Sequence, residues 1–265
     1  MKRILCPLFW ILPLLLLTSC TEGSEGPKIL VQADQAYLNG EYLEAEDRYQ
    51  EFIRSHADHP ARWEAWNRLL SISRHIRRDV GRSVDVLEAM YLEFGDHPER
   101  SREVLPALGN ELIKLGEKER AATAWEKLLE IPGTDPKMKW ETAKRLVDLH
   151  LSQGDIALTR AVLDTAEKWD LSGEQRAALL YESAKLLQVQ GKIEQAKSEL
   201  KKVSDLVDSG NHYATFSVFM LADIHEQEGD HGTALMLFES ISEKYPNPGT
   251  VAKRIEALKK RLEHD

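Results

Sequence analysis

Nine histidines give the chain side chains that could bind a metal ion, and His56 and His59 stand three residues apart. Two imidazoles at such a spacing can reach one zinc ion when further ligands complete its coordination shell. Here Asp58 and Pro60 mark a turn around His59, and no His-x₃-His or His-Glu-x-x-His spacing occurs elsewhere. We therefore expect no metal site and no other cofactor.

Signatures of catalysis are missing from the sequence. It has no Gly-rich phosphate loop, no Gly-x-Ser-x-Gly elbow and no obvious serine, histidine and acid constellation. The many carboxylates lie beside Arg and Lys at three- and four-residue spacings, which is typical of solvated helix faces. We therefore predict that the chain is not an enzyme.

The composition excludes two further classes of protein. The 265 residues are 42% hydrophobic and 30% charged, with a formal net charge of -9. Such an apolar chain can fold around a core, so intrinsic disorder is excluded. Its acidic balance argues against a sequence-independent grip on nucleic acid phosphates, and we expect other proteins as partners.

Both cysteines, Cys6 and Cys20, lie near the N-terminus. The chain begins with Lys2 and Arg3, continues through an apolar stretch at 4–17 and reaches small residues just before Cys20. This order is typical of a secretory signal, and the apolar stretch is too short to cross a bilayer as a helix. We predict a signal peptide over residues 1–19.

The end of that signal, Leu17-Thr18-Ser19-Cys20, resembles a bacterial lipobox. The resemblance implies cleavage after Ser19, a diacylglyceryl thioether on Cys20 and acylation of the new amino group by a fatty acid such as palmitate. Residues 20–27 then form a lipidated tether. Because Thr21 is not the Asp that resembles an inner-membrane retention signal, we expect anchoring in the outer membrane, on its periplasmic face. An ordinary signal whose cleavage site happens to end in cysteine stays open as the alternative.

A repeat of about 38 residues organises the rest of the chain. Turn glycines recur at intervals of 37 or 38 residues, or twice that, at Gly40, Gly116, Gly154, Gly191 and Gly229. Five residues after each glycine stands a small residue and nine after it a large apolar one, as with Ala121 and Trp125 in the third repeat. This spacing predicts a second helix that packs closely against the first.

Helical periodicity on both sides of each turn predicts six helical hairpins over residues 28–248. The second repeat lacks its turn glycine and has Arg78 there. Second helices are predicted to stop at Pro60, Pro98 and Pro136.

The C-terminal segment, residues 249–265, is predicted to form an amphipathic helix from Thr250 to Leu262 that caps the last hairpin. The predicted fold class is therefore all-α: an α-solenoid, or superhelix, of six hairpins with a capping helix.

These hairpins resemble the tetratricopeptide repeat family, with its Leu-Gly pair, turn glycine, small alanine and aromatic residue. Departures are the period of 38 in place of the family's usual 34 and the missing glycine at Arg78. The resemblance implies that a partner binds in a groove lined by the first helix of each hairpin. On this basis the predicted partner-binding residues are Tyr37, Arg68, His75, Asn110, Lys144, Tyr181, Lys185 and Phe219. Their mixed charge departs from the Lys- and Asn-rich clamp that certain relatives use for C-terminal carboxylates.

A basic cluster stands out in this acidic chain and consists of Arg74, Arg77, Arg78 and Arg82, with His75 among them. Cations near a helix end can simply interact favourably with the helix dipole. The alternative is a docking patch for an acidic partner, anionic lipid or lipopolysaccharide phosphate.

The sequence thus predicts an outer-membrane-anchored periplasmic scaffold that binds peptides or helices of other envelope proteins, in envelope protein assembly. Three alternatives stay open: a pilot lipoprotein for type IV pilus or secretin assembly, a peptidoglycan-enzyme accessory protein, and a structural spacer. For hydrolysis of peptidoglycan, Asp148 and Asp223 would have to act together. They fall two repeats apart, about 20 Å when hairpins stack at about 10 Å, which is wider than paired catalytic carboxylates.

Overall fold

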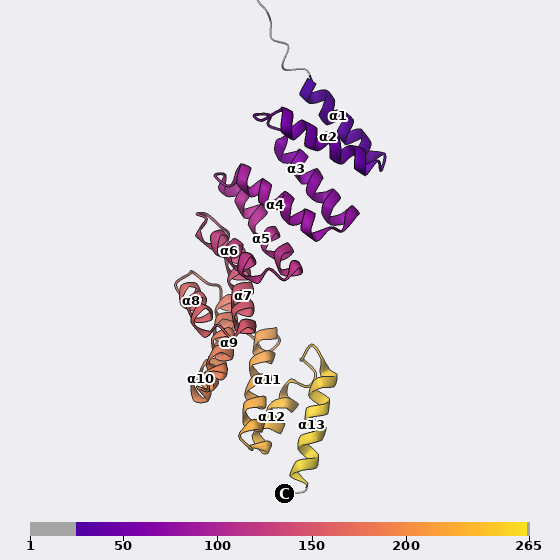
Figure 1. The fold of residues 1–265 in the computed structure, drawn as a ribbon. Coiled ribbons are helices and arrows are strands. Elements are labelled where there is room, and N and C mark those ends of the chain that lie inside the picture. Colours follow the sequence, from indigo (N-terminus) through magenta and orange to yellow (C-terminus); the bar gives the residue numbers. More distant parts are fainter. Residues whose placement is uncertain (1–24, 264–265) are drawn as a thin grey trace, which may run out of the picture. The chain divides into compact units, whose positions relative to one another are not determined.

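The computed structural model describes residues 25–263 as helices joined by short turns (Figure 1). The predicted signal peptide, Cys20 and most of the predicted tether lie outside the described residues. Within them, no helix is long and apolar enough to cross a membrane. The chain divides into two compact units, the first ending at Val86 and the second starting at Leu87.

The first unit begins with a helical hairpin. Its helices α1 (Glu25–Leu38) and α2 (Tyr42–Ser55) are followed by α3 (Arg62–Ser71), the π-helix η1 (Ile72–Arg77) and the start of α4 (Val80–Phe94). Tyr49 and Phe52 of α2 are fully buried in this unit.

The second unit contains the end of α4 and a series of paired helices. These are α5 (Pro98–Leu115), α6 (Lys118–Glu130), α7 (Pro136–Gln153), α8 (Ile156–Ala166), α9 (Gly173–Val189), α10 (Ile193–Val203), α11 (His212–Gln227), α12 (His231–Ile241) and α13 (Pro248–Leu262). Hairpins form from α5 with α6, α7 with α8, α9 with α10, and α11 with α12. The predicted all-α fold of paired hairpins is confirmed.

Small residues explain how closely the helices pair. The six predicted small positions are all 0% exposed: Ala45, Ser83, Ala121, Thr159, Ala196 and Ala234. At Gly109 an added Cβ would collide with the indole of Trp125. A methyl group is therefore excluded where α5 meets α6.

The turns of the hairpins need a left-handed backbone. Gly116 has φ +81° and Gly229 has φ +82°, a region that glycine enters without steric cost. In the second repeat Arg78 takes this position with φ 53° and ψ 36°, directly after η1. It is the one non-glycine residue with positive φ within residues 25–263.

The prediction that Pro98 and Pro136 stop second helices is wrong. The second helices end earlier, α4 at Phe94 and α6 at Glu130, and the two prolines are the first residues of α5 and α7. Proline suits the first turn of a helix because the N–H that it lacks has no partner there.

The predicted C-terminal helix is present as α13 and packs against α12. Its Val251 and Leu258 are 0% exposed and share a cluster with Phe238 and Ile241. The terminal helix therefore covers apolar side chains of the last hairpin, as a cap must do.

Candidate partner-binding surface

Two predicted residues, Lys144 on α7 and Lys185 on α9, meet at one carboxylate. Asp148 accepts from Lys144 Nζ at 2.9 Å and from Lys185 Nζ at 3.3 Å. Lys185 also donates to Glu182 Oε2 at 2.6 Å. These four residues, the lysine–carboxylate cluster, join the first helices of two successive hairpins.

Burial shapes the electrostatics of this cluster. Glu182 is only 1% exposed, and desolvation raises the pKa of its carboxyl despite the nearby Lys185. For Lys185, burial lowers the pKa, but the attraction of Glu182 and Asp148 outweighs it and raises the pKa above the usual value. Lys185 therefore stays cationic at neutral pH.

A row of aromatic rings lies next to the cluster. Lys185 Nζ is 5.8 Å from the ring of Tyr181, which lies 6.0 Å from the rings of Tyr213 and Phe216. Phe216 is 5.8 Å from Tyr245, and Tyr245 stacks on Phe219 at 4.8 Å. The aromatic row thus consists of Tyr181, Tyr213, Phe216, Phe219 and Tyr245.

The residues of this row differ in how far they are exposed. Tyr213 is buried at 9% exposure, whereas the other four are partly exposed. Burial raises the pKa of the phenols of Tyr181, Tyr213 and Tyr245. These hydroxyls therefore stay protonated at neutral pH and can donate hydrogen bonds to a partner.

Sequence reasoning found Tyr181 and Phe219 but missed the residues that connect them. Phe216 lies one helical turn before Phe219, and this i, i+3 spacing was the available signal. Tyr245 follows α12 in a segment without periodicity, so only the structure places it in the row.

The remaining predicted residues lie elsewhere. In the first unit, Arg68 lies over the ring of Tyr37 at 5.1 Å, and Tyr37 Oη is 3.2 Å from Ser71 Oγ. His75 is exposed in η1 and Asn110 is exposed on α5. Within the described residues, Asn110 has no ring or polar contact to the aromatic row of its own unit, and His75 belongs to the first unit.

The basic cluster is partly neutralised by a residue that the sequence did not reveal. The side chain of Glu46 is 9% exposed, and its carboxylate lies 2.6 Å from Arg77 and 3.4 Å from Arg82. Both arginines therefore tie η1 and α4 to α2 within the first unit. Arg78 is exposed and Arg74 is half-buried.

Residues 217–248, which include most of α11 and all of α12, match the tetratricopeptide repeat family. This chain carries a tetratricopeptide repeat. The match includes Phe219 and Tyr245 of the aromatic row. No curated protein sequence matches the chain.

Solved structures of low sequence identity have a similar fold. PilW, described as a widely conserved type IV pilus biogenesis factor, is 14% identical, with a TM-score of 0.52 over 86% of this chain and 99% of its own. MamA from Desulfovibrio magneticus RS-1 is 19% identical, with a TM-score of 0.50 over 68% of this chain and 93% of its own. Pseudomonas aeruginosa PilF is 11% identical, with a TM-score of 0.49 over 91% of this chain and 99% of its own. The likenesses to PilW and MamA show the fold alone, a tetratricopeptide-like stack of helical hairpins.

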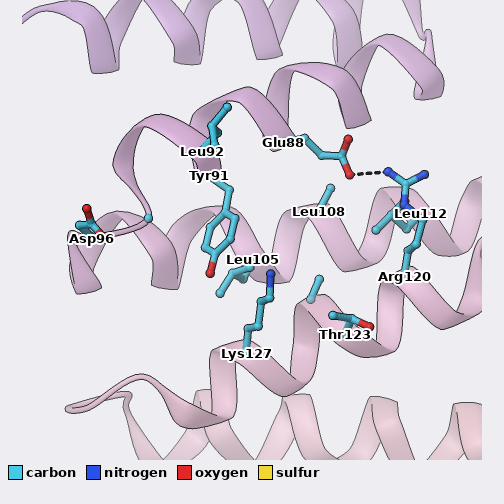
Figure 2. Close-up of a pocket in the computed structure, with 12 residues that line it drawn as sticks. Glu88, Tyr91, Leu92, Asp96, Leu105, Leu108, Leu112, Arg120, Thr123 and Lys127 are labelled. Atoms are coloured by element: carbon cyan, nitrogen blue, oxygen red, sulfur yellow. Dashed lines mark hydrogen bonds and ion pairs between the residues drawn. The ribbon is translucent and has the colours of Figure 1, made fainter.

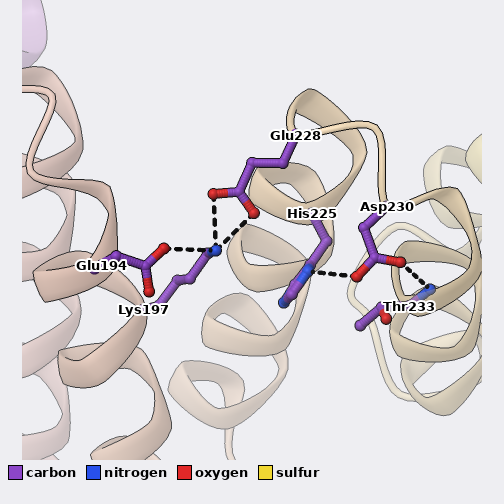
Figure 3. A network of polar contacts seen from close by, with 6 residues as sticks. All are labelled: Glu194, Lys197, His225, Glu228, Asp230 and Thr233. Atoms are coloured by element: carbon purple, nitrogen blue, oxygen red, sulfur yellow. Dashed lines mark hydrogen bonds and ion pairs between the residues drawn. The ribbon is translucent and has the colours of Figure 1, made fainter.

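A polar network ties the matched repeat to the hairpin before it (Figure 3). Lys197 on α10 donates to Glu228 at 2.6 Å, and its hydrogen bonds raise the pKa of Lys197.

Within the turn of the matched repeat, His225 Nδ1 lies 3.1 Å from Asp230, whose other oxygen accepts from the Thr233 N–H at 3.1 Å. Hydrogen bonds from Thr233 lower the pKa of Asp230. The network holds the repeat's turn together.

The paired histidines pack against an aromatic ring. The rings of His56 and His59 lie 5.2 and 5.1 Å from that of Phe52. No group of three His, Cys, Asp or Glu residues in the described part of the chain could hold a metal ion.

The carboxylates considered for catalysis are held by cations. Asp148 belongs to the lysine–carboxylate cluster, and Asp223 pairs with Arg254 of α13. Both carboxylates therefore form ion pairs with neighbouring cations.

A separate groove with a volume of about 660 Å³ lies between the end of α4, α5 and α6 (Figure 2). Its apolar floor includes Leu105, Leu108 and Leu112, and an ion pair between Glu88 and Arg120 spans its rim. This groove could not be predicted from the sequence, because its lining comes from three helices.

Proposed function

We propose that this chain is a protein-binding scaffold, held at the periplasmic face of the outer membrane by a lipidated Cys20. The tetratricopeptide repeat fold implies protein partners, and the signal and lipobox at residues 1–20 support the location. A membrane anchor raises the local concentration of the scaffold for membrane-bound partners without any new contact. Its role is in the assembly of envelope proteins.

The partner segment, an amphipathic helix or an extended peptide, binds on the aromatic row. The observation that carries this proposal is a set of partly exposed rings, Tyr181, Phe216, Phe219 and Tyr245, beside an ion-paired rim. A few hot-spot residues, often aromatic, dominate the binding energy of protein interfaces, and the contacts around them exclude water. The lysine–carboxylate cluster provides such a rim on one side.

Crosslinking in cells tests the proposal. Photoreactive residues replace Tyr181 or Phe219 in the row, with matched controls at Gln195 and Met236, which are exposed on the second helices α10 and α12. We expect one envelope protein to be captured from the row and not from the controls. Equal capture from both positions, or none, would remove the aromatic row as the binding surface. Further positions at Tyr37 and Arg78 test the first unit and the basic cluster.

A second candidate is a pilot role in type IV pilus or secretin assembly. The fold likeness to PilW, which spans 99% of that chain, favours it. Deletion of the gene distinguishes the two: loss of secretin multimers with normal levels of other outer-membrane proteins supports the pilot role, and the reverse supports general envelope assembly. An accessory role in peptidoglycan cleavage predicts changed sacculus turnover instead.

A further inference from the structure

A groove between α10, α11 and the end of α12 has an apolar floor and a volume of about 400 Å³. The floor includes Leu200, Ala214, Leu221 and Ile241, none more than 8% exposed. The groove shares no residue with the aromatic row, so its ligand need not compete with the proposed partner.

The rim of this groove is cationic. The exposed lining residues are all lysines and serines: Lys201, Ser204, Ser209, Ser240 and Lys244. Lys244 Nζ lies 3.1 Å from the neutral Ser209 Oγ, and Lys201 forms no ion pair within the described residues. No Asp or Glu lines the groove. Two positive charges thus stand at the edge of an apolar floor without a lining carboxylate to oppose them.

One buried hydroxyl of the lining has no hydrogen-bond partner. Ser217 is 2% exposed, lines the groove, and its Oγ has no partner. The neighbouring Thr215 instead donates to the carbonyl oxygen of His212 at 2.9 Å. This oxygen has less than 1 Å² of exposed surface, so a ligand in the groove does not reach it, and the charge of the rim alone selects an anion.

The equivalent grooves of other hairpins differ in charge. Between α4 and α6, the acids Glu88 and Asp96 stand beside Arg120 and Lys127. The smaller groove at α8 and α9, about 210 Å³, has three carboxylates, from Asp164, Glu167 and Glu199, and one arginine. Among these three grooves only the one between α10 and α12 selects for an anion.

We propose that this groove binds an aliphatic carboxylate, in the form of a free medium-chain fatty acid. The alkyl chain lies on Leu200, Leu221 and Ile241, where it leaves water as the hydrophobic effect requires. The carboxylate accepts from Lys201 and Lys244 at the rim of the groove. An uncharged alkyl chain lacks the group that these donors need.

Photolabelling of the full chain in membranes tests this proposal. Decanoate with a diazirine near the end of its alkyl chain is added to the membranes, and the sample is illuminated. The labelled residues are then identified by mass spectrometry. We expect labels within 200–221 and 240–244, removed by excess unlabelled decanoate but not by decanol. Labels spread over the chain, or equal competition by decanol, would overturn the proposal.

Variants separate a specific site from general affinity for lipid. Reversal of both rim charges, Lys201→Glu with Lys244→Glu, should lower groove labelling about tenfold, because two charge-assisted contacts are lost. The matched control, Lys168→Glu with Lys253→Glu, reverses two exposed charges outside the groove and should leave labelling unchanged. Val218→Trp fills the groove without changing charge and should also remove the label. Circular dichroism checks that each variant is folded. Unchanged labelling in both groove variants would contradict the proposal.

Discussion

Arg78 holds a backbone conformation that suits glycine. Its φ of 53° brings the Cβ close to the backbone. The turns of the other five hairpins have a glycine with positive φ at the equivalent position. We expect Arg78→Gly to raise the free energy of unfolding by about 1 kcal/mol, because relief of strain exceeds the extra chain entropy of glycine. Denaturant unfolding of the two chains measures the difference.

The matched control for this prediction is Gly116→Ala at the turn between α5 and α6. Gly116 has φ +81° and no atom lies near its would-be Cβ, so only backbone strain is added. The control should lower stability by about 1 kcal/mol. If Arg78→Gly also lowers stability, the arginine side chain contributes more than its strained backbone costs, and the strain argument fails.

Burial of Glu182 should make the stability of the folded chain depend on pH. Burial raises the pKa of its carboxyl in the folded chain above the usual 4.5, so the folded state binds more protons than the unfolded state between the two values. The free energy of unfolding therefore falls as the pH rises from the pKa of Glu182 in the unfolded chain through its higher pKa in the folded chain. We expect Glu182→Gln to flatten this part of the stability curve, measured by denaturation from pH 4 to 8. An identical slope in the variant would show that Glu182 titrates normally.

At the level of single residues, the repeat period predicts which side chains lie on the same face of successive hairpins. Lys144, Tyr181 and Phe219 occupy equivalent positions of successive first helices, so the repeat period alone placed them on related faces. Glu182 and Glu46 were not recognised as buried, because the sequence around a buried glutamate looks the same as the sequence around an exposed one. Only the packing of neighbouring helices shows which acid is covered.

The pairing of α5 and α6 depends on the absence of a side chain at Gly109. An added methyl group would collide with the indole of Trp125, a residue that is only 4% exposed. We expect Gly109→Ala to lower the free energy of unfolding by about 1 to 3 kcal/mol through overpacking. Thermal unfolding followed by circular dichroism measures the loss.

Gly232 in α12 provides a comparison for that substitution. No atom lies within 4 Å of its would-be Cβ, and its φ is not positive, so alanine should add helix propensity alone. Gly232→Ala is expected to raise stability by about 0.5 kcal/mol. If both substitutions had the same effect, close approach would not explain Gly109.

Helices and hairpins could be predicted because their signals are local. A turn glycine, a small residue and a large apolar residue lie within ten positions of one another, so one repeat contains its own pattern. The π-helix η1, which is followed by the left-handed Arg78, could not be predicted, because no local signal in the sequence marks a widened helical turn. The start of α5 at Pro98 was misjudged for a similar reason, since proline either precedes or begins a helix.

On the scale of the whole chain, stability in a repeat protein comes from each hairpin and its contacts with neighbours. The last hairpin depends on α13, whose Val251 is 0% exposed among Phe238 and Ile241. Ion pairs from Arg254 to Glu226 at 3.0 Å and from Lys259 to Glu239 at 2.8 Å add to this contact. Loss of α13 should therefore leave an apolar surface on α12.

A buried charge at Val251 tests how far this dependence extends. We expect Val251→Asp to detach α13 and to lower hydrogen-exchange protection in α12 and then α11, because an unpaired carboxylate cannot stay in an apolar cluster. Residues 25–86 should keep their protection, since they belong to the other compact unit, which has its own internal contacts. Ala252→Asp, at the exposed neighbouring position, is the matched control and should leave all protection unchanged. Uniform loss of protection along the chain would mean that the hairpins unfold as one cooperative unit, and nearest-neighbour stabilisation would then not describe this protein.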